Sequence, residues 1–303
     1  MNYRHAYHAG NFADVVKHWV LTLALEHLKR KDAPFRVIDT HAGRGRYQLT
    51  SPEASKTLEW RTGIGRLIGP EAEALSGALA QSLKLYLDVV RAENAPGALA
   101  CYPGSPAITA ALLRGQDTLI ANEAHPEVLK ELEADLGRPR RGIKLLGLDG
   151  WTALRALLPP PERRGIILID PPFEEEGELA RLAAGLGEGL RRFATGVFIA
   201  WYPIKDGKTT RRLLTRLAEM VPPKLLSLEV LIRQVRNREA LNGCGLLIAN
   251  PPFTLETVLR NAAPALTRRL AVGPGASCSL RWVKALRSDS DGGTQERGAR
   301  RKS

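Results

Sequence analysis

The sequence predicts an α/β protein with a mostly parallel central sheet and helices on both of its faces. Short apolar runs of strand length alternate along the chain with longer amphipathic segments of helix length. Strands separated by helices in this way form parallel sheets. Several of the apolar runs end in an acidic residue, and ligands bind at the carboxyl ends of parallel strands. With 303 residues, of which 44% are hydrophobic, the chain can also bury a sizeable core.

The expected elements follow one another in a regular order. The first helix is expected at 14–31, where Val16, Trp19, Val20 and Leu23 recur at helical spacing. Later helices are expected at 106–114, 126–136, 177–192, 208–220 and 254–262. Strands are expected at 36–39, 117–122, 143–148, 165–170, 196–201, 225–232 and 244–249, because each is a short, largely apolar run.

A small helical insertion interrupts this alternation after the first strand. Residues 52–94 are rich in Ala, Glu and Leu at helical periodicity, and glycines at positions 63, 65, 69 and 77 break the pattern. The chain therefore divides into an N-terminal segment with the first strand (1–48), the insertion (49–95), the remainder of the core (96–285) and a basic tail (286–303). The polar composition of the tail predicts disorder.

The net charge of +12 and a pI of about 9.9 predict a polyanionic partner. The segment from Lys284 onward contributes only +3, so most of the excess belongs to the folded part. Basic residues cluster at 138–144, 205–216 and 233–238. A solvated basic surface is the alternative, because the excess of arginine over lysine is also what genome composition produces. Nucleic acid is the partner that we expect.

The composition also indicates the compartment. Cys101, Cys244 and Cys278 are scattered and form no CxxC pair, which favours a reducing environment and argues against zinc. No stretch of about 18 apolar residues occurs, and residues 1–10 lack the apolar region of a signal peptide. We therefore expect a soluble, cytoplasmic protein without a membrane partner. The oligomeric state is not readable from the sequence.

The most informative motif is Asp170-Pro171-Pro172-Phe173, which ends the apolar run 165–169. An exocyclic amine of a nucleobase is a poor nucleophile, because its lone pair is delocalised into the ring. Two acceptors aimed at its hydrogens, the Asp170 carboxylate and the Pro171 carbonyl, would favour a more tetrahedral nitrogen. Phe173 offers a flat face for stacking the base. The alternative is that proline merely stops the strand.

A second string, Asn250-Pro251-Pro252-Phe253, matches the same pattern after the run 245–249. A late strand that enters the sheet as a hairpin partner runs against the parallel strands, so its end faces away from the ligand edge. We therefore interpret this second string as a structural strand end.

Three further features indicate a nucleotide-like cofactor. The turn Ala42-Gly43-Arg44-Gly45 allows close approach of the backbone but is shorter than a GxGxxG fingerprint. Glu123 and Asp149-Gly150 end successive strands, where carboxylates hold ribose hydroxyls or an adenine amine. Arg44 and Arg46 would instead suit a phosphate, so the loop does not by itself identify the cofactor.

The N-terminal region adds basic side chains. His5 and His8 have a spacing that metal sites use, but no third ligand stands near, so no metal is expected. Lys17 and His18 fall near the start of the first helix, where a carboxylate is favoured, such as that of a methionine moiety. A packed histidine is the alternative for His18.

Taken together, these strings closely resemble the RlmJ family of bacterial 23S ribosomal RNA adenine-N6 methyltransferases, from the N-terminus to about residue 283. The strings that carry the resemblance are Tyr3-Arg4-His5, His8-Ala9-Gly10-Asn11, Ala13-Asp14-Val15, Lys17-His18, Asp39-Thr40-His41-Ala42-Gly43, Gly45-Arg46-Tyr47, Tyr102-Pro103-Gly104-Ser105-Pro106, 163–173, Arg192-Phe193-Ala194-Thr195-Gly196 and Trp201-Tyr202-Pro203. The resemblance implies a Rossmann-like class I fold that uses S-adenosylmethionine.

The resemblance also implies roles for individual residues. Asp170, with Pro171, Pro172 and Phe173, would form the catalytic pocket, although the family pattern has tyrosine where this chain has Phe173. The implied cofactor contacts are Lys17, His18, His41, Ser105, Glu123, Asp149, Gly150 and Asp170. Tyr3 and His5 would meet the 23S ribosomal RNA.

Other functions fit part of this pattern. They are methylation of guanine N2 or of DNA adenine, and nucleic-acid binding without catalysis. A nicotinamide dehydrogenase explains neither Asp170-Pro171-Pro172-Phe173 nor the basic surface.

Overall fold

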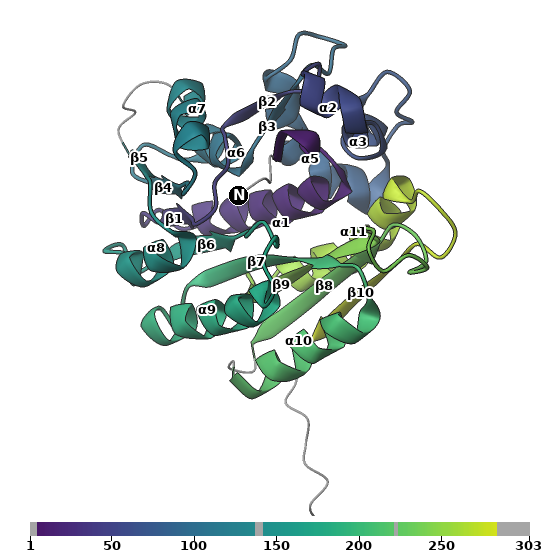
Figure 1. Ribbon diagram of the computed structural model, residues 1–303. Helices are drawn as coiled ribbons and strands as arrows, with labels where there is room; N and C mark the ends of the chain where they lie inside the picture. The colour runs from purple at the N-terminus through teal and green to yellow at the C-terminus, as the bar shows by residue number, and fades with distance from the viewer. Residues whose placement is uncertain (1–4, 137–141, 221–223, 284–303) are drawn as a thin grey trace, which may run out of the picture.

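The core of this computed structural model is an eight-stranded sheet in the order β10-β8-β9-β7-β6-β1-β4-β5 (Figure 1). The structure describes residues 5–136, 142–220 and 224–283. Strands β5, β4, β1, β6 and β7 are parallel, whereas β9 runs antiparallel to both β7 and β8, and β10 is antiparallel to β8. The strands are β1 Arg36–Asp39, β4 Thr118–Asn122, β5 Ile143–Leu146, β6 Gly165–Ile169, β7 Val197–Ile204, β8 Leu225–Leu231, β9 Gly243–Ala249 and β10 Ser277–Trp282. The predicted α/β class with a mostly parallel sheet is confirmed.

Helices cover both faces of the sheet because its central strands are apolar on both sides. Along β6, Ile166 and Leu168 point into one core, and Ile167 and Ile169 point into the other. Helices α1 (Phe12–Lys29), α5 (Gly77–Ala92), α6 (Ser105–Leu112), α7 (Pro126–Leu136) and α11 (Leu255–Leu270) contribute to the first core. Helices α8 (Gly150–Leu157), α9 (Glu178–Arg192) and α10 (Gly207–Met220) contribute to the second core. Figure 1 shows these two layers above and below the strands.

Three elements of the main sheet and its covering helices differ from the sequence expectation. Helix α8 was not predicted, because its apolar stripe is only two turns long. Helix α11 continues to Leu270 instead of ending at 262, although Pro264 lies inside it. Pro264 has no backbone N–H to donate, and the burial of Ala263 and Leu266 on either side of it keeps the helix packed on the core. Strand β10 was missed because it lies at the edge of the sheet and its side chains are largely exposed or half-buried.

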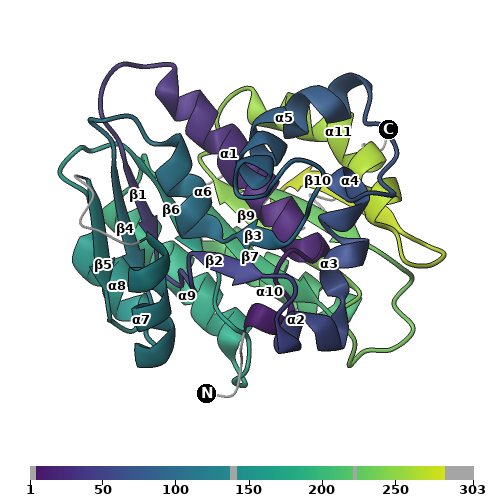
Figure 2. The ribbon, with the colours of Figure 1, turned by 90° about the horizontal axis from the view of Figure 1, so that it is seen from above.

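The segment predicted as a helical insertion contains α2 (Pro52–Thr57), α3 (Glu59–Thr62), α4 (Gly65–Ile68) and α5. Helix α5 packs on α1 and α11, so the insertion lies over the first core (Figure 2). The backbone of Gly63 approaches that of Gly10 so closely that a Cβ at position 63 would lie 2.1 Å from the Gly10 carbonyl oxygen. A short antiparallel pair, β2 (Arg46–Gln48) with β3 (Cys101–Pro103), flanks the insertion and was not predicted.

The antiparallel direction of β9 places Asn250 at the edge of the sheet opposite to Asp170. The Asn250 amide donates to the carbonyl oxygens of Ala194 and Gly196, each at 2.8 Å, and so fixes the loop that enters β7. The interpretation of the second Pro-Pro-Phe string as a structural strand end is confirmed. Among the described residues, no helix is both long enough and apolar enough to cross a bilayer.

Candidate active site

Acidic side chains gather where the parallel strands end. Asp39 ends β1, Glu123 follows β4, and Asp170 follows β6. Asp149 lies three residues beyond β5, where it caps α8 by accepting a hydrogen bond of 2.8 Å from the Thr152 amide. Because parallel strands end at one edge, sequence positions spread over 131 residues form one site.

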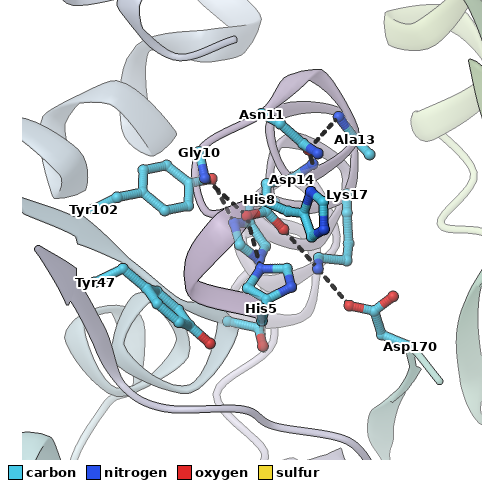
Figure 3. A network of polar contacts seen from close by, with 12 residues as sticks. His5, His8, Gly10, Asn11, Ala13, Asp14, Lys17, Tyr47, Tyr102 and Asp170 are labelled. Atoms are coloured by element: carbon cyan, nitrogen blue, oxygen red, sulfur yellow. Dashed lines mark hydrogen bonds and ion pairs between the residues drawn. The ribbon is translucent and has the colours of Figure 1, made fainter. Parts of the chain in front are cut away.

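Asp170 belongs to a chain of polar contacts with the N-terminal region (Figure 3). The Lys17 ammonium pairs with Asp170 and lies 2.8 Å from Asp14 Oδ1. On the other side, Asp14 Oδ2 accepts from the Gly10 amide at 2.9 Å and lies 3.0 Å from His5 Nε2. The contact between Lys17 and Asp170 therefore connects the tip of β6 to the residues that precede α1.

Burial alone would neutralise both members of the Lys17–Asp14 pair. Burial acts to raise the pKa of Asp14, but the Lys17 ammonium and His5 outweigh it and hold the pKa well below its usual value. Burial likewise acts to lower the pKa of Lys17, but the carboxylates of Asp14 and Asp170 outweigh it and hold the pKa well above its usual value. Lys17 is therefore a permanent cation that holds Asp170, which is 17% exposed.

The turn after Asp170 places its aromatic residue, which is half-buried, against the second core. Pro171 is buried, and Phe173 has a left-handed φ of 54°, a costly conformation for a side chain of this size. The Phe173 ring packs edge-on against Trp201 of β7, with 5.5 Å between ring centroids. Its stacking role toward a base stays a prediction.

Asp39 is a buried carboxylate with an unfilled acceptor. Its Oδ2 accepts from Ser105 Oγ at 2.6 Å, whereas the buried Oδ1 has no hydrogen-bond partner among the described residues. Burial raises the pKa of Asp39 to about 7, and the Asp170 carboxylate adds to this effect, while the Ser105 hydrogen bond opposes it. This hydrogen bond places Ser105, a predicted cofactor residue, at the tip of β1.

A raised pKa at Asp39 predicts a pH-dependent cost in stability. The folded protein keeps a proton that the unfolded chain releases near pH 3.9, so the contribution of Asp39 to stability is greatest below about pH 4 and is lost as the pH rises through about 7. The full effect is on the order of 4 kcal/mol. Asp39→Asn should therefore gain stability over the wild type as the pH increases. Urea unfolding at pH 5 and pH 8 measures this gain, and an equal difference at both pH values would contradict it.

His41 follows β1 and contacts α8. Its ring packs edge-on against Trp151, with 5.4 Å between centroids, and a Cβ at Gly150 would lie 2.3 Å from His41 Nε2. Burial lowers the pKa of His41 to about 4 although Asp170 and Asp149 act to raise it, so the ring is neutral at pH 7. The structure therefore brings together three predicted cofactor residues, His41, Asp149 and Gly150.

Glu123 stabilises the glycine turn after β1. Its carboxylate accepts from the Gly43 amide at 2.9 Å and from the His125 amide at 2.8 Å. Gly43 has a φ of 62°, which favours glycine. Arg44 and Arg46, which could have suited a phosphate, pair instead with Asp135 and Glu93, respectively.

His18 lies apart from this edge, in the packing between α1 and α5. It is 1% exposed, its Nδ1 lies 2.7 Å from the Tyr102 hydroxyl, and Tyr102 in turn contacts Tyr86 at 2.9 Å. Burial lowers the pKa of His18 to about 3. The structure thus shows the packed histidine that was the alternative, and its contact with a cofactor stays a prediction.

The remaining predicted positions are placed as follows. Tyr3 lies outside the described residues. His5 packs edge-on against Tyr47, with 5.2 Å between centroids, while His8 Nδ1 lies 3.0 Å from Glu59 Oε2 of α3. Within the described ranges, no group of three His, Cys, Asp or Glu side chains is arranged to hold a metal.

Two residues of the site were missed as functional candidates. Asp14 sits three residues before Lys17 on one helix face, and this spacing is a readable signal for an ion pair. Asp39 ends a short apolar run in the same way as Asp170, so the rule used for strand tips would have identified it.

Comparisons with known proteins identify the family to which this site belongs. The family model described as ribosomal RNA large subunit methyltransferase D, RlmJ, matches residues 32–284. The chain belongs to this family. The predicted resemblance is confirmed, and with it the Rossmann-like class I methyltransferase fold and S-adenosylmethionine as the cofactor.

Individual RlmJ relatives align over nearly their whole length. Proteins of Escherichia coli (strain K12) and Haemophilus influenzae, both named ribosomal RNA large subunit methyltransferase J, are 38% identical over 283 residues and 37% identical over 284 residues. Each alignment covers 93% of this chain and 99% of the relative. A crystal structure of a Legionella pneumophila protein is 32% identical with a TM-score of 0.79, and the match covers 91% of this chain and 98% of that one.

The residues at the strand tips fit the cofactor of the RlmJ family. The unfilled Oδ1 of Asp39 is suited to accept from an ammonium group, such as that of a methionine moiety. Glu123 and Asp149 offer carboxylate oxygens for ribose hydroxyls or an adenine amine. When bound, S-adenosylmethionine supplies an electrophilic methyl group.

Proposed function

We propose that this protein methylates the N6 amine of an adenine in 23S ribosomal RNA, in the cytoplasm. The observation that carries the proposal is the position of Asp170: it lies at the carboxyl edge of the parallel strands, anchored by Lys17 and beside His41 and Asp39. The names of the relatives, which are ribosomal RNA methyltransferases, support the same substrate class.

In this mechanism the chain's own residues accept hydrogen bonds from the amine and so align it for the reaction. The Asp170 carboxylate and the Pro171 carbonyl each accept one N–H of the base, which favours a lone pair directed at the methyl donor. Lys17 holds the carboxylate in place. After methyl transfer the amine is cationic, so the proton leaves to Asp170 or to water. The base must be unpaired or extruded before it reaches this site.

Nucleoside analysis of ribosomal RNA tests the proposal. In a strain that lacks the gene, mass spectrometry of 23S ribosomal RNA should show the loss of one N6-methyladenosine, and a plasmid copy of the gene should restore it. A loss of N2-methylguanosine would assign the guanine reaction instead. A loss confined to DNA adenine methylation would assign a DNA substrate, and an unchanged set of modified nucleosides would refute methylation altogether.

A further inference from the structure

A basic groove lies between α9 and α10 and begins at the active-site turn. It has a volume of about 500 Å³, and Phe173 lines it three residues after Asp170. Pro203, near the carboxyl end of β7, also lines the groove. The basic side chains that line the groove are Lys205, Arg212, Arg216 and Arg238.

The basic residues of α10 occupy one face of the helix. Lys208, Arg211, Arg212, Thr215 and Arg216 line a second hollow of about 410 Å³ beside the first. Their spacing is that of a single helical stripe, while Leu213, Leu214 and Leu217 face the core. At a rise of about 1.5 Å per residue, the stripe extends roughly 12 Å along the helix.

The arginines of this groove lie outside ion-pair distance of every acidic side chain that the structure describes, unlike several arginines elsewhere in the described chain. Arg36, Arg46 and Arg114 pair with Glu162, Glu93 and Asp117, respectively. In contrast, the exposed side chains of Arg212, Arg216 and Arg238 form no ion pair with any residue that the structure describes, although Arg238 lies near enough to Asp206 to help lower the pKa of that carboxyl.

The acidic residues of the groove are already engaged. Glu175 and Glu178 both pair with Arg181 of α9. Asp206 caps α10 by accepting from the backbone amides of Lys208 and Thr209, each at 2.8 Å. The groove therefore presents a net positive surface to solvent, directly next to the residue predicted to stack on the target base.

We propose that this groove binds the phosphate backbone of the RNA strand that flanks the target adenine. The inference rests on the proposed function, because a base that reaches Asp170 brings its neighbouring phosphates with it. A guanidinium group without an ion-pair partner can donate two parallel hydrogen bonds to the oxygens of one phosphate. Such contacts fix the register of the strand and offset the cost of extruding the base.

The double variant Arg212→Gln/Arg216→Gln tests the groove in the full-length protein with saturating cofactor. The KM for a 23S ribosomal RNA fragment should rise on the order of ten-fold at physiological salt, with kcat retained, because phosphate contacts position the strand. The slope of log affinity against log salt should fall by about 1.4, as expected for two lost contacts to a single strand.

Arg30→Gln/Lys31→Gln is the matched control. It removes the same charge from exposed positions that precede β1, at the opposite edge of the sheet, and it should leave the KM and the salt slope unchanged. A wild-type protein that methylates no RNA refutes the proposed function itself. A wild type that is active, with a groove variant that behaves like the control, refutes only the groove. Loss of cofactor affinity in the groove variant would also overturn the inference.

Discussion

Replacing Asp170 with alanine should lower kcat by about 10³-fold, because it removes an acceptor that is positioned before the reaction starts. Asp170 is partly exposed, and Asp14 remains to neutralise Lys17, so the variant should fold. Asp170→Asn should keep part of the rate, since its amide oxygen still accepts one N–H of the base. Single-turnover methylation of a 23S ribosomal RNA fragment measures these rates, and filter binding should show RNA affinity close to that of the wild type.

The second Pro-Pro-Phe string supplies the control for this prediction. Asn250→Ala removes two hydrogen bonds at the opposite edge of the sheet and leaves alanine with a left-handed φ of 50°. It should cost about 2 kcal/mol of unfolding free energy, with the methylation rate retained. An Asp170→Ala enzyme that turns over as fast as Asn250→Ala would show that the carboxylate has no part in the chemistry.

The difference between these two strings shows what the sequence can predict. Both are buried strands that end in a polar residue and two prolines, so local pattern does not separate them. Strand direction separates them. It could be inferred because parallel strands need a crossover of about a dozen residues or more, whereas the connection between β8 and β9, residues 232–242, is shorter than that. Ligand-edge carboxylates could therefore be predicted from the chain order.

The anchoring of Asp170 was not predictable from such rules. Lys17 and Asp170 are 153 residues apart, and they meet only because α1 packs across β6, β7 and β9. The same packing explains His18, which faces α5 rather than the strand tips because Tyr86 of α5 and Tyr102 of β3 lie against it. Contacts that depend on where an inserted helix docks leave no local signal in the sequence.

Lys17→Met should produce the largest loss of stability among single substitutions at the site. Asp14 is only 2% exposed, and removal of the ammonium leaves its carboxylate without its strongest partner. Breaking a buried pair in this way costs about 3 to 5 kcal/mol. Methyl transfer should fall as well, because Asp170 loses the contact that fixes its position. Urea unfolding and single-turnover rates measure the two effects separately.

The double variant Asp14→Asn/Lys17→Met separates stability from catalysis. Replacing the orphaned carboxylate with an amide removes the buried charge, while the amide oxygen can still accept from the Gly10 amide. Most of the lost stability should therefore return. The rate should not return, because nothing in the double variant holds Asp170. If the stability and the rate of the double variant recover together, Lys17 serves only the fold. If the single variant Lys17→Met loses neither stability nor rate, the contact between Lys17 and Asp170 contributes to neither.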